Sequence, residues 1–356
     1  MSLIKRYLFR ETLLSVLLVM VALLAIFSFF DFIQELENLG KGHYTLTRIF
    51  VFVLLSAPGH VYEVVPVAVL IGSLYALAQT SRNSELVVMQ ASGMSMLRIG
   101  VPLLLVGVLF GLITFVVGEL VTPVSEKTAQ RMRIKATKSI VAQEFRSGFW
   151  VKDGNSFVNV RQVKPDAELV DINIYRFNHN FELVGIDHAK RGRYNGQRWL
   201  LKDLYQSSIS KDSVRSKFYP VSQWDSLIKP ELLNVLLVVP EKMSASSLYS
   251  YIKHLTENKQ KTSRYEIALW SKMVYPIASA VMILLALPFG FLQQRMGGVG
   301  GKIFTGIILG ILFQVLNRVF VHLGLLNDWS PIFSTVTPTI LFLATGLMMM
   351  QLISRR

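Results

Sequence analysis

Long apolar runs separated by short polar stretches occupy both ends of the chain. The first run has 19 residues and follows a basic start, and five more runs of similar or greater length lie further along. About 20 apolar residues are needed to cross a bilayer as a helix. The pattern therefore predicts six membrane-spanning helices, at Thr12–Phe30, Ile49–Ala78, Ile99–Gly118, Met273–Gln294, Ile303–Leu326 and Ile332–Ile353.

The polar region between the third and fourth runs has a different period. Pro123–Lys138 keeps a helical pattern, but short apolar runs then alternate with turn signals such as Asp153-Gly154 and Asn195-Gly196. Such alternation is typical of β-hairpins. Leu248–Leu255 returns to helical period. We therefore predict a membrane α+β fold, in which an antiparallel β domain is inserted between spanning helices 3 and 4.

These elements divide the chain into three parts. The first, 1–138, holds spans one to three and a short cytoplasmic helix at 82–93. The second, 139–245, is the β domain, and the third, 246–356, holds spans four to six.

The stretch Arg82–Gly93 is too short to cross a bilayer, and its middle is too apolar for an ordinary solvent-exposed loop. Asn83 or Ser84 is expected to cap a helix, with Glu85 at its positive dipole end, and Gly93 fits the left-handed position that closes a helix. We predict a helix of about two turns. It either carries force from a soluble partner into the membrane or rests on the lipid as an amphipathic connector.

Basic residues in the short loops orient the spans, because Lys and Arg accumulate on the cytoplasmic side. The outside short loops would hold only Lys41 and Arg48. We therefore expect both termini in the cytoplasm and the β domain outside. The nine basic residues then placed inside are Lys5, Arg6, Arg10, Arg82, Arg98, Arg295, Lys302, Arg355 and Arg356.

The composition agrees with a membrane protein. The chain has 356 residues, of which 52% are hydrophobic and 17% charged, which excludes an ordinary soluble protein. Its net charge of +14 comes without a nucleic-acid-binding motif, so anionic lipid is the expected partner. Because the chain has no cysteine, it has neither disulfides nor thiolate metal sites.

Enzyme chemistry finds little support. Gly297–Lys302 resembles a phosphate-binding loop, but Met296 stands where the first glycine should be and Ile303 where a hydroxyl should be. His60 and Glu63 lie one helical turn apart, too few ligands for a metal. We therefore expect no nucleotide site, no metal and no catalytic residues in this chain.

Two sets of charges are candidates for binding. Glu63 and Arg318 lie deep in spans, and Gln314 and Asn317 are close to Arg318 in sequence. They form either a structural pair or the polar lining of a substrate cavity. A basic stripe near the outer surface either binds an anion or is a solvated face that anchors the span. It consists of Lys127, Arg131, Lys135 and Lys138.

The stretch Ser84–Gly93, SELVVMQASG, resembles the lipopolysaccharide-export permeases of the LptF/LptG family, and the G-type members most closely. The similarity extends over nearly the whole chain. Further matching stretches are Gly148–Val158, Arg264–Lys272 with Pro276, and Thr305, Gly306, Gly310, Phe313 and Asn317 in span five.

The resemblance implies a periplasmic β-jellyroll and a role in an ABC exporter of the bacterial inner membrane. An F-type and a G-type permease would enclose a cavity for lipopolysaccharide, and a cytoplasmic ATPase dimer would use ATP and magnesium. Jellyroll bridge proteins, including a single-span anchor protein, would receive the lipid in the periplasm. The residues implied to couple the ATPase are Glu85, Leu86, Val88, Met89 and Gly93.

One departure from the family concerns the outer end of span one, where G-type members tend to carry lysines. Asp31, Glu35, Glu37 and Asn38 occupy this stretch, and Lys41 and Arg48 are the nearby cations. Arg318 or the basic stripe is expected to replace the missing charge. Two other functions stay open: a membrane-anchored periplasmic scaffold or sensor, and a related ABC permease that exports lipoproteins.

Overall fold

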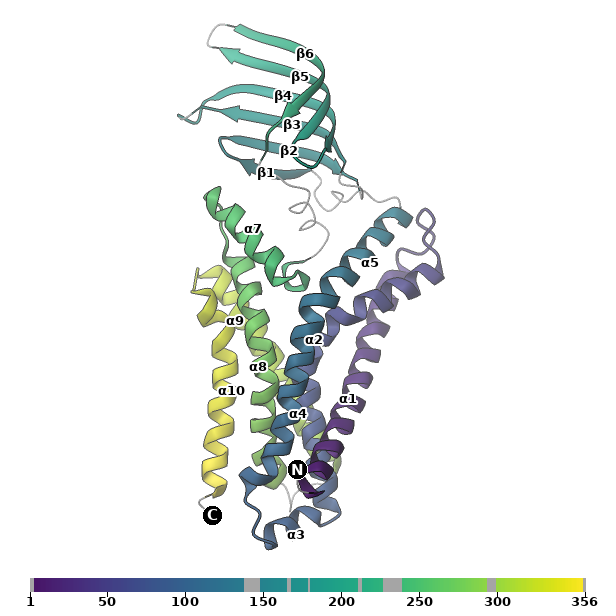
Figure 1. Ribbon diagram of the computed structural model, residues 1–356, viewed down its shortest axis with the longest axis vertical. Helices are drawn as coiled ribbons and strands as arrows, with labels where there is room; N and C mark the ends of the chain where they lie inside the picture. The colour runs from purple at the N-terminus through teal and green to yellow at the C-terminus, as the bar shows by residue number, and fades with distance from the viewer. Residues whose placement is uncertain are drawn as a thin grey trace. The chain divides into compact units, whose positions relative to one another are not determined.

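The computed structural model describes residues 3–137, 148–164, 168–178, 180–210, 213–226, 239–292 and 299–354. The helices are α1 (Leu3–Leu36), α2 (Leu46–Arg82), α3 (Glu85–Ala91), α4 (Met96–Val116), the π-helix η1 (Val117–Val121), α5 (Thr122–Thr137), the 3₁₀ turn η3 (Pro240–Lys242), α7 (Ala245–Glu257), α8 (Ser263–Leu292), α9 (Val299–Leu326) and α10 (Pro331–Ser354). The strands are β1 (Phe149–Asp153), β2 (Ser156–Val163), β3 (Leu169–Phe177), β4 (Leu183–Tyr194), β5 (Trp199–Ser210) and β6 (Ser213–Trp224) (Figure 1).

Six helices in the described part of the chain are long and apolar enough to cross a membrane, which confirms the six predicted spans. The helices exceed the predicted runs at their ends, because hydropathy marks only the apolar centre. α1, for example, has 34 residues. α2 stays one helix through Pro58 and Pro66.

The residues group into two compact units, which we describe separately. One unit consists of 1–33, 53–125 and 263–356, and the other of 34–52 and 126–262. Residues 34–52 and 126–137 thus group with the β strands by their contacts, although by sequence they adjoin the spans.

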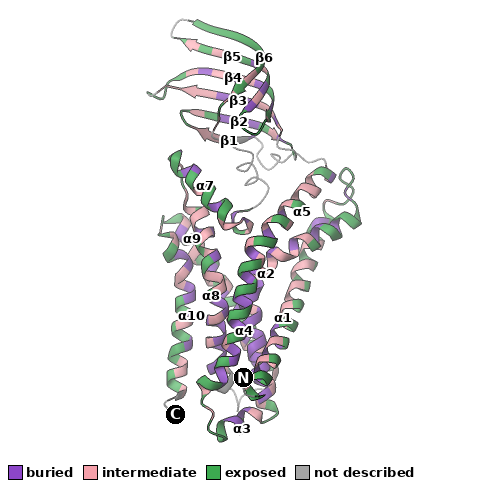
Figure 2. Cartoon of the chain, in the orientation of Figure 1, coloured by how far each residue is buried: buried purple, intermediate pink, exposed green. Residues whose placement is uncertain are grey.

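In the first unit, α2, α4 and α8 supply most of the buried side chains (Figure 2). Small residues let α4 approach α8 closely. A Cβ on Gly111 would lie 2.5 Å from the carbonyl oxygen of Pro276, and one on Gly107 would lie 2.7 Å from Ile283. Such close backbone approach is how helices pack in lipid, where apolar burial adds little. The first turn of α1, the last turn of α10 and α3 lie at the same end of this bundle (Figure 1).

The second unit contains a six-stranded antiparallel sheet with the strand order β1-β2-β3-β4-β5-β6. The predicted hairpins are confirmed, since β1 pairs with β2 across Gly154 and β4 with β5 across Gly196. One face carries an apolar core that includes Val160, Ile172 and Trp199. This confirms the predicted antiparallel β insertion.

Two helices of this unit were also predicted. α5 confirms the helix expected at Pro123–Lys138, although Lys138 itself lies outside the described residues, and α7 confirms the helical period at Leu248–Leu255. Asn258, the C-cap of α7, accepts a hydrogen bond from the backbone N–H of Gly154 over 3.2 Å. The first hairpin of the sheet is therefore attached to the end of α7.

Candidate functional site

α3 is the short helix predicted between spans two and three, and it has one buried and one exposed side. Leu86 and Met89 are 0% and 8% exposed and belong to the bundle core, whereas Val87 and Val88 are 49% and 65% exposed. Of the predicted coupling residues, Leu86 and Met89 thus anchor the helix and Val88 faces outward. Val87, which sequence reasoning omitted, lies on the exposed side.

The two ends of α3 are built differently from each other. Ser84 occupies the N-cap position, as predicted, but it has a φ of 62° and makes no side-chain cap bond, and Asn83 Nδ2 donates to Glu85 Oε1 instead of accepting from the backbone. At the other end Gly93 has a φ of +84°, as predicted. The N–H of Gly93 donates to Gln90 and that of Met94 to Met89, which satisfies the last carbonyls of the helix.

The predicted cavity residues of the bundle are partly brought together. Gln314 Nε2 in α9 donates to the backbone carbonyl of Glu63 in α2 over 2.8 Å, and Asn317 is buried. Arg318 is exposed on the surface of this single chain. Among the described residues there is no ion pair between Glu63 and Arg318. Lys41 belongs to the other unit.

His60 pairs with a residue that sequence reasoning did not connect to it. Its Nε2 lies 2.5 Å from Oδ2 of Asp31 in α1, and its ring centre lies 5.3 Å from that of Phe27. The described residues include no cluster of three His, Asp or Glu side chains that could hold a metal ion. His60 and Asp31 instead join α1 to α2.

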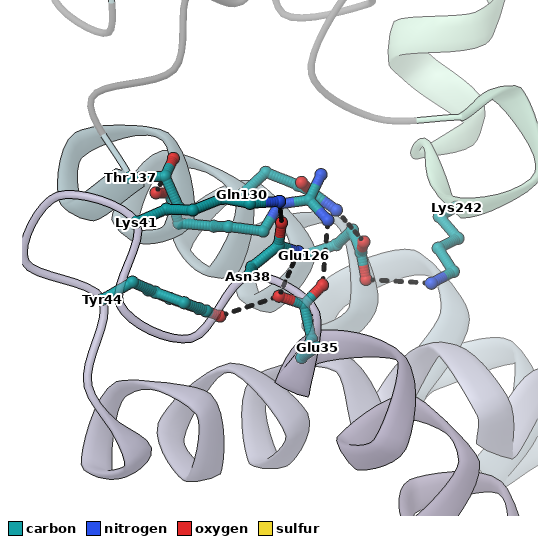
Figure 3. Close-up of polar contacts among 9 residues, drawn as sticks. Glu35, Asn38, Lys41, Tyr44, Glu126, Gln130, Thr137 and Lys242 are labelled. Carbon is teal, nitrogen blue, oxygen red and sulfur yellow. Dashed lines mark hydrogen bonds and ion pairs between the residues drawn. The ribbon is translucent and has the colours of Figure 1, made fainter.

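A polar network gathers around Glu35 at the C-terminal end of α1 (Figure 3). Glu35 is 4% exposed and accepts hydrogen bonds from Tyr44 Oη and Arg133 Nη1, each over 3.0 Å. Burial and the Glu35 carboxylate raise the pKa of Tyr44 well above its ordinary range, so this hydroxyl stays protonated. Lys41 Nζ donates to Asn38 Oδ1 over 2.8 Å. Two acidic residues of this stretch, Asp31 and Glu35, therefore both have partners within the protein.

A second part of the network lies along α5. Glu126 accepts from Gln130 Nε2 over 2.9 Å and from Lys242 Nζ over 3.1 Å, which ties the turn before α7 to α5 (Figure 3). Arg133 and Glu126 are not members of the predicted basic stripe. In that stripe, Lys127 and Arg131 are half-buried, Lys135 is exposed and Lys138 lies outside the described residues.

The comparisons with known proteins cover nearly the whole chain. A model of the family "Lipopolysaccharide export system permease LptF/LptG" matches residues 6–352. The chain is similar to the lipopolysaccharide export system permease protein LptG of Haemophilus influenzae, with 33% identity over 91% of this chain and 90% of that protein. It is also similar to LptG of Escherichia coli K12, with 31% identity over 98% of each chain. The chain therefore belongs to the lipopolysaccharide export system permease family LptF/LptG.

Proposed function

We propose that this chain is a permease subunit of an ABC exporter, which extracts lipopolysaccharide from the inner membrane and passes it to a periplasmic bridge toward the outer membrane. Membership of the LptF/LptG family and the six apolar helices support the proposal. The names of the relatives specify lipopolysaccharide export.

The observation that carries the proposal is the two-sided geometry of α3. Leu86 and Met89 are fixed in the core of the bundle, while Val87 and Val88 are exposed between the ends of two spans. A soluble ATPase bound to the exposed side would push on a helix whose other side is packed against the spans. ATP and magnesium would bind to that ATPase, and this chain would have no catalytic residues.

The charges of the short loops support an orientation of the chain in the membrane. Lys5, Arg82 and Arg98 flank the end of the bundle that contains α3, as cytoplasmic loops do under the positive-inside rule. Both termini and α3 would then be cytoplasmic, and the sheet periplasmic.

The substrate path would use the surfaces that this chain leaves exposed. Only 11% of the most apolar window of α1 is buried, which leaves this helix available to an F-type permease and to lipid. Arg318 and Gln314 of α9 would face the lipopolysaccharide, and cations including Lys41 would lie near its phosphates. The apolar face of the sheet would shelter acyl chains, whose exposure costs about 0.8 kcal/mol per CH₂ group. Bridge proteins with a similar sheet, one of them anchored by a single span, would take the lipid onward.

The test is a quantitative pull-down from native membranes, with mass spectrometry of the bound proteins and lipids. Wild type is compared with Val88→Glu and with Val214→Glu on β6, because the two valines are 65% and 67% exposed. We expect an ATPase, a second permease and lipopolysaccharide to co-purify with the wild type. Val88→Glu should reduce the bound ATPase by about tenfold or more, as expected for a buried charge at an interface, and Val214→Glu should not.

A wild-type chain that purifies alone from a detergent that preserves such complexes would contradict the proposal and favour the scaffold function. Lipoprotein instead of lipopolysaccharide in the complex would favour the related lipoprotein exporter.

A further inference from the structure

The carboxylate of Glu85 is held from α1. The hydroxyl of Tyr7, in the second turn of α1, donates to Glu85 Oε2 over 2.9 Å. Asn83 Nδ2 donates to Oε1 over 3.2 Å. Two donors therefore fix the orientation of this side chain, and the donor from α1 is 78 residues away in the sequence.

Apolar contacts surround this hydrogen bond. Leu8, the residue after Tyr7, is 2% exposed and belongs to the same core cluster as Leu86 and Met89 of α3. The inner end of α1 and the buried side of α3 thus pack into a single core. Close packing of this kind transmits displacement, because protein interiors are poorly compressible.

The inner half of α1 also lies directly on α2. A Cβ on Gly72 would come within 2.5 Å of the Cα of Val16, so the two backbones are in contact. Further out, most apolar side chains of α1 are exposed, including Leu18, Phe29 and Phe30. α1 is thus a long helix with much of its surface uncovered, and Tyr7 hydrogen-bonds its inner end to α3.

We infer that Tyr7 is a positioning residue of the exporter, whose hydroxyl, through Glu85, passes displacements of α3 to α1. This inference rests on the proposed function, in which an ATPase displaces α3. Because a helix is stiff, a movement of the inner end of α1 also moves the exposed part that faces a second permease or lipid. Tyr7 therefore connects the ATPase surface to the outer surface of the bundle.

Another role is open to a tyrosine at this position. The aromatic ring can anchor a helix at the membrane–water boundary, and this role does not need the hydroxyl to bond a carboxylate. Tyr7→Phe separates the two roles, because it keeps the ring and removes only the donor. Tyr249→Phe in α7 is the matched control, since Tyr249 is 66% exposed and loses the same hydroxyl.

The experiment uses the assembled exporter in proteoliposomes and measures the lipopolysaccharide released to an acceptor protein per ATP hydrolysed. It also measures the amount of ATPase bound per permease. We expect Tyr7→Phe to lower the released lipid per ATP about fivefold, the size expected for one lost hydrogen bond, with the ATPase still bound. Tyr249→Phe should match the wild type.

The same ratio of lipid to ATP in Tyr7→Phe and Tyr249→Phe would overturn the inference. A loss of bound ATPase that accounts for all of the lost transport would overturn it too, since the hydroxyl would then serve only docking. Failure of the proposed function is a separate result: the wild-type complex itself would lack an ATPase or would release no lipopolysaccharide with ATP.

Discussion

Nζ of Lys272 in α8 donates to the backbone carbonyl of Gly118, 3.0 Å away in the π-helix between α4 and α5. This carbonyl lacks a backbone donor within its helix, because the N–H of Thr122 donates to Val117 and Pro123 has no N–H. Nζ also lies 3.8 Å from the Glu119 carboxylate. A buried cation in a span thus completes a hydrogen bond that the π-helix leaves open.

Replacing this cation should destabilise the bundle. Lys272→Met keeps the approximate length of the side chain but leaves the buried carbonyl of Gly118 without a donor, at a cost of about 2 kcal/mol. The unfolding midpoint in detergent should fall, whereas Lys253→Met at an exposed position of α7 should leave it unchanged. Equal midpoints for the two variants would show that the lysine does not satisfy the carbonyl.

A backbone donor should replace the lysine in part. Pro123→Ala restores an N–H five residues after Gly118, where it can donate to the free carbonyl in π-helical geometry. We therefore expect the double variant Pro123→Ala/Lys272→Met to be more stable than the sum of the two single changes predicts, by about 1 kcal/mol. Additive effects in this double-mutant cycle, measured by the same unfolding assay, would contradict the assignment of the open carbonyl.

Gly118 should not tolerate a larger residue. A Cβ at this position would lie 2.5 Å from Cδ2 and 2.7 Å from Cε2 of the Tyr62 ring. Gly118→Ala should therefore cost about 1–3 kcal/mol through overpacking. Gly301→Ala in α9 is the control, because nothing lies within 4 Å of its Cβ position. If the unfolding midpoints of the two variants are alike, the ring has moved away at no cost.

Loss of the Glu35 carboxylate should open the loop between α1 and α2. Glu35→Ala leaves Arg133 and the Tyr44 hydroxyl without their acceptor, at a cost of about 2 kcal/mol after allowance for the partial exposure of Arg133. Amide hydrogen exchange of residues 37–45 should accelerate, including that of His43, whose N–H donates to Ala136. Glu37→Ala, at an exposed position, is the control. Unchanged amide exchange after Glu35→Ala would show that this network does not stabilise the loop.

The attachment of α7 should weaken in mild acid. Burial lowers the pKa of His254 below its ordinary value of 6.5, against the opposing effect of Asp153 and Glu257. The folded state therefore favours neutral His254, and this stability is fully present above pH 6.5 and lost as the pH falls below it. The protection factors of the α7 amides, which correct for the slower intrinsic exchange at lower pH, should fall between pH 7.5 and 5.5 in the wild type and less in His254→Gln. An equal fall in both proteins would assign the pH effect to other groups.

The elements of the fold could be predicted because their signals are local. The apolar runs gave six spans, and turn residues such as Gly154 and Gly196 marked hairpins that the strand register confirms. The side-chain capping bond of α3 was predicted wrongly, although Ser84 is the N-cap, because two local options compete: Asn83 donates to a side chain instead of accepting from the backbone.

The polar pairs were not predictable in the same way, because each joins helices whose packing no local pattern specifies. His60 and Asp31 are 29 residues apart, Arg133 and Glu35 are 98 apart, and Lys272 and Gly118 are 154 apart. One signal could have been noticed: Pro123, five residues after Gly118 in a helical run, implies that a carbonyl loses its donor. The roles of Glu85, Lys41 and Arg318 in transport stay predictions.

The strand order of the sheet bears on how the protein is made. Each of the six described strands pairs only with its neighbours in the chain, so no strand waits for a distant partner. Folds dominated by such short-range pairing form early and quickly. Hairpins can therefore close one after another as each part of the domain emerges during synthesis. This sheet can be assembled while α8, α9 and α10 are still being synthesised, and membrane insertion can resume from a domain that has already folded.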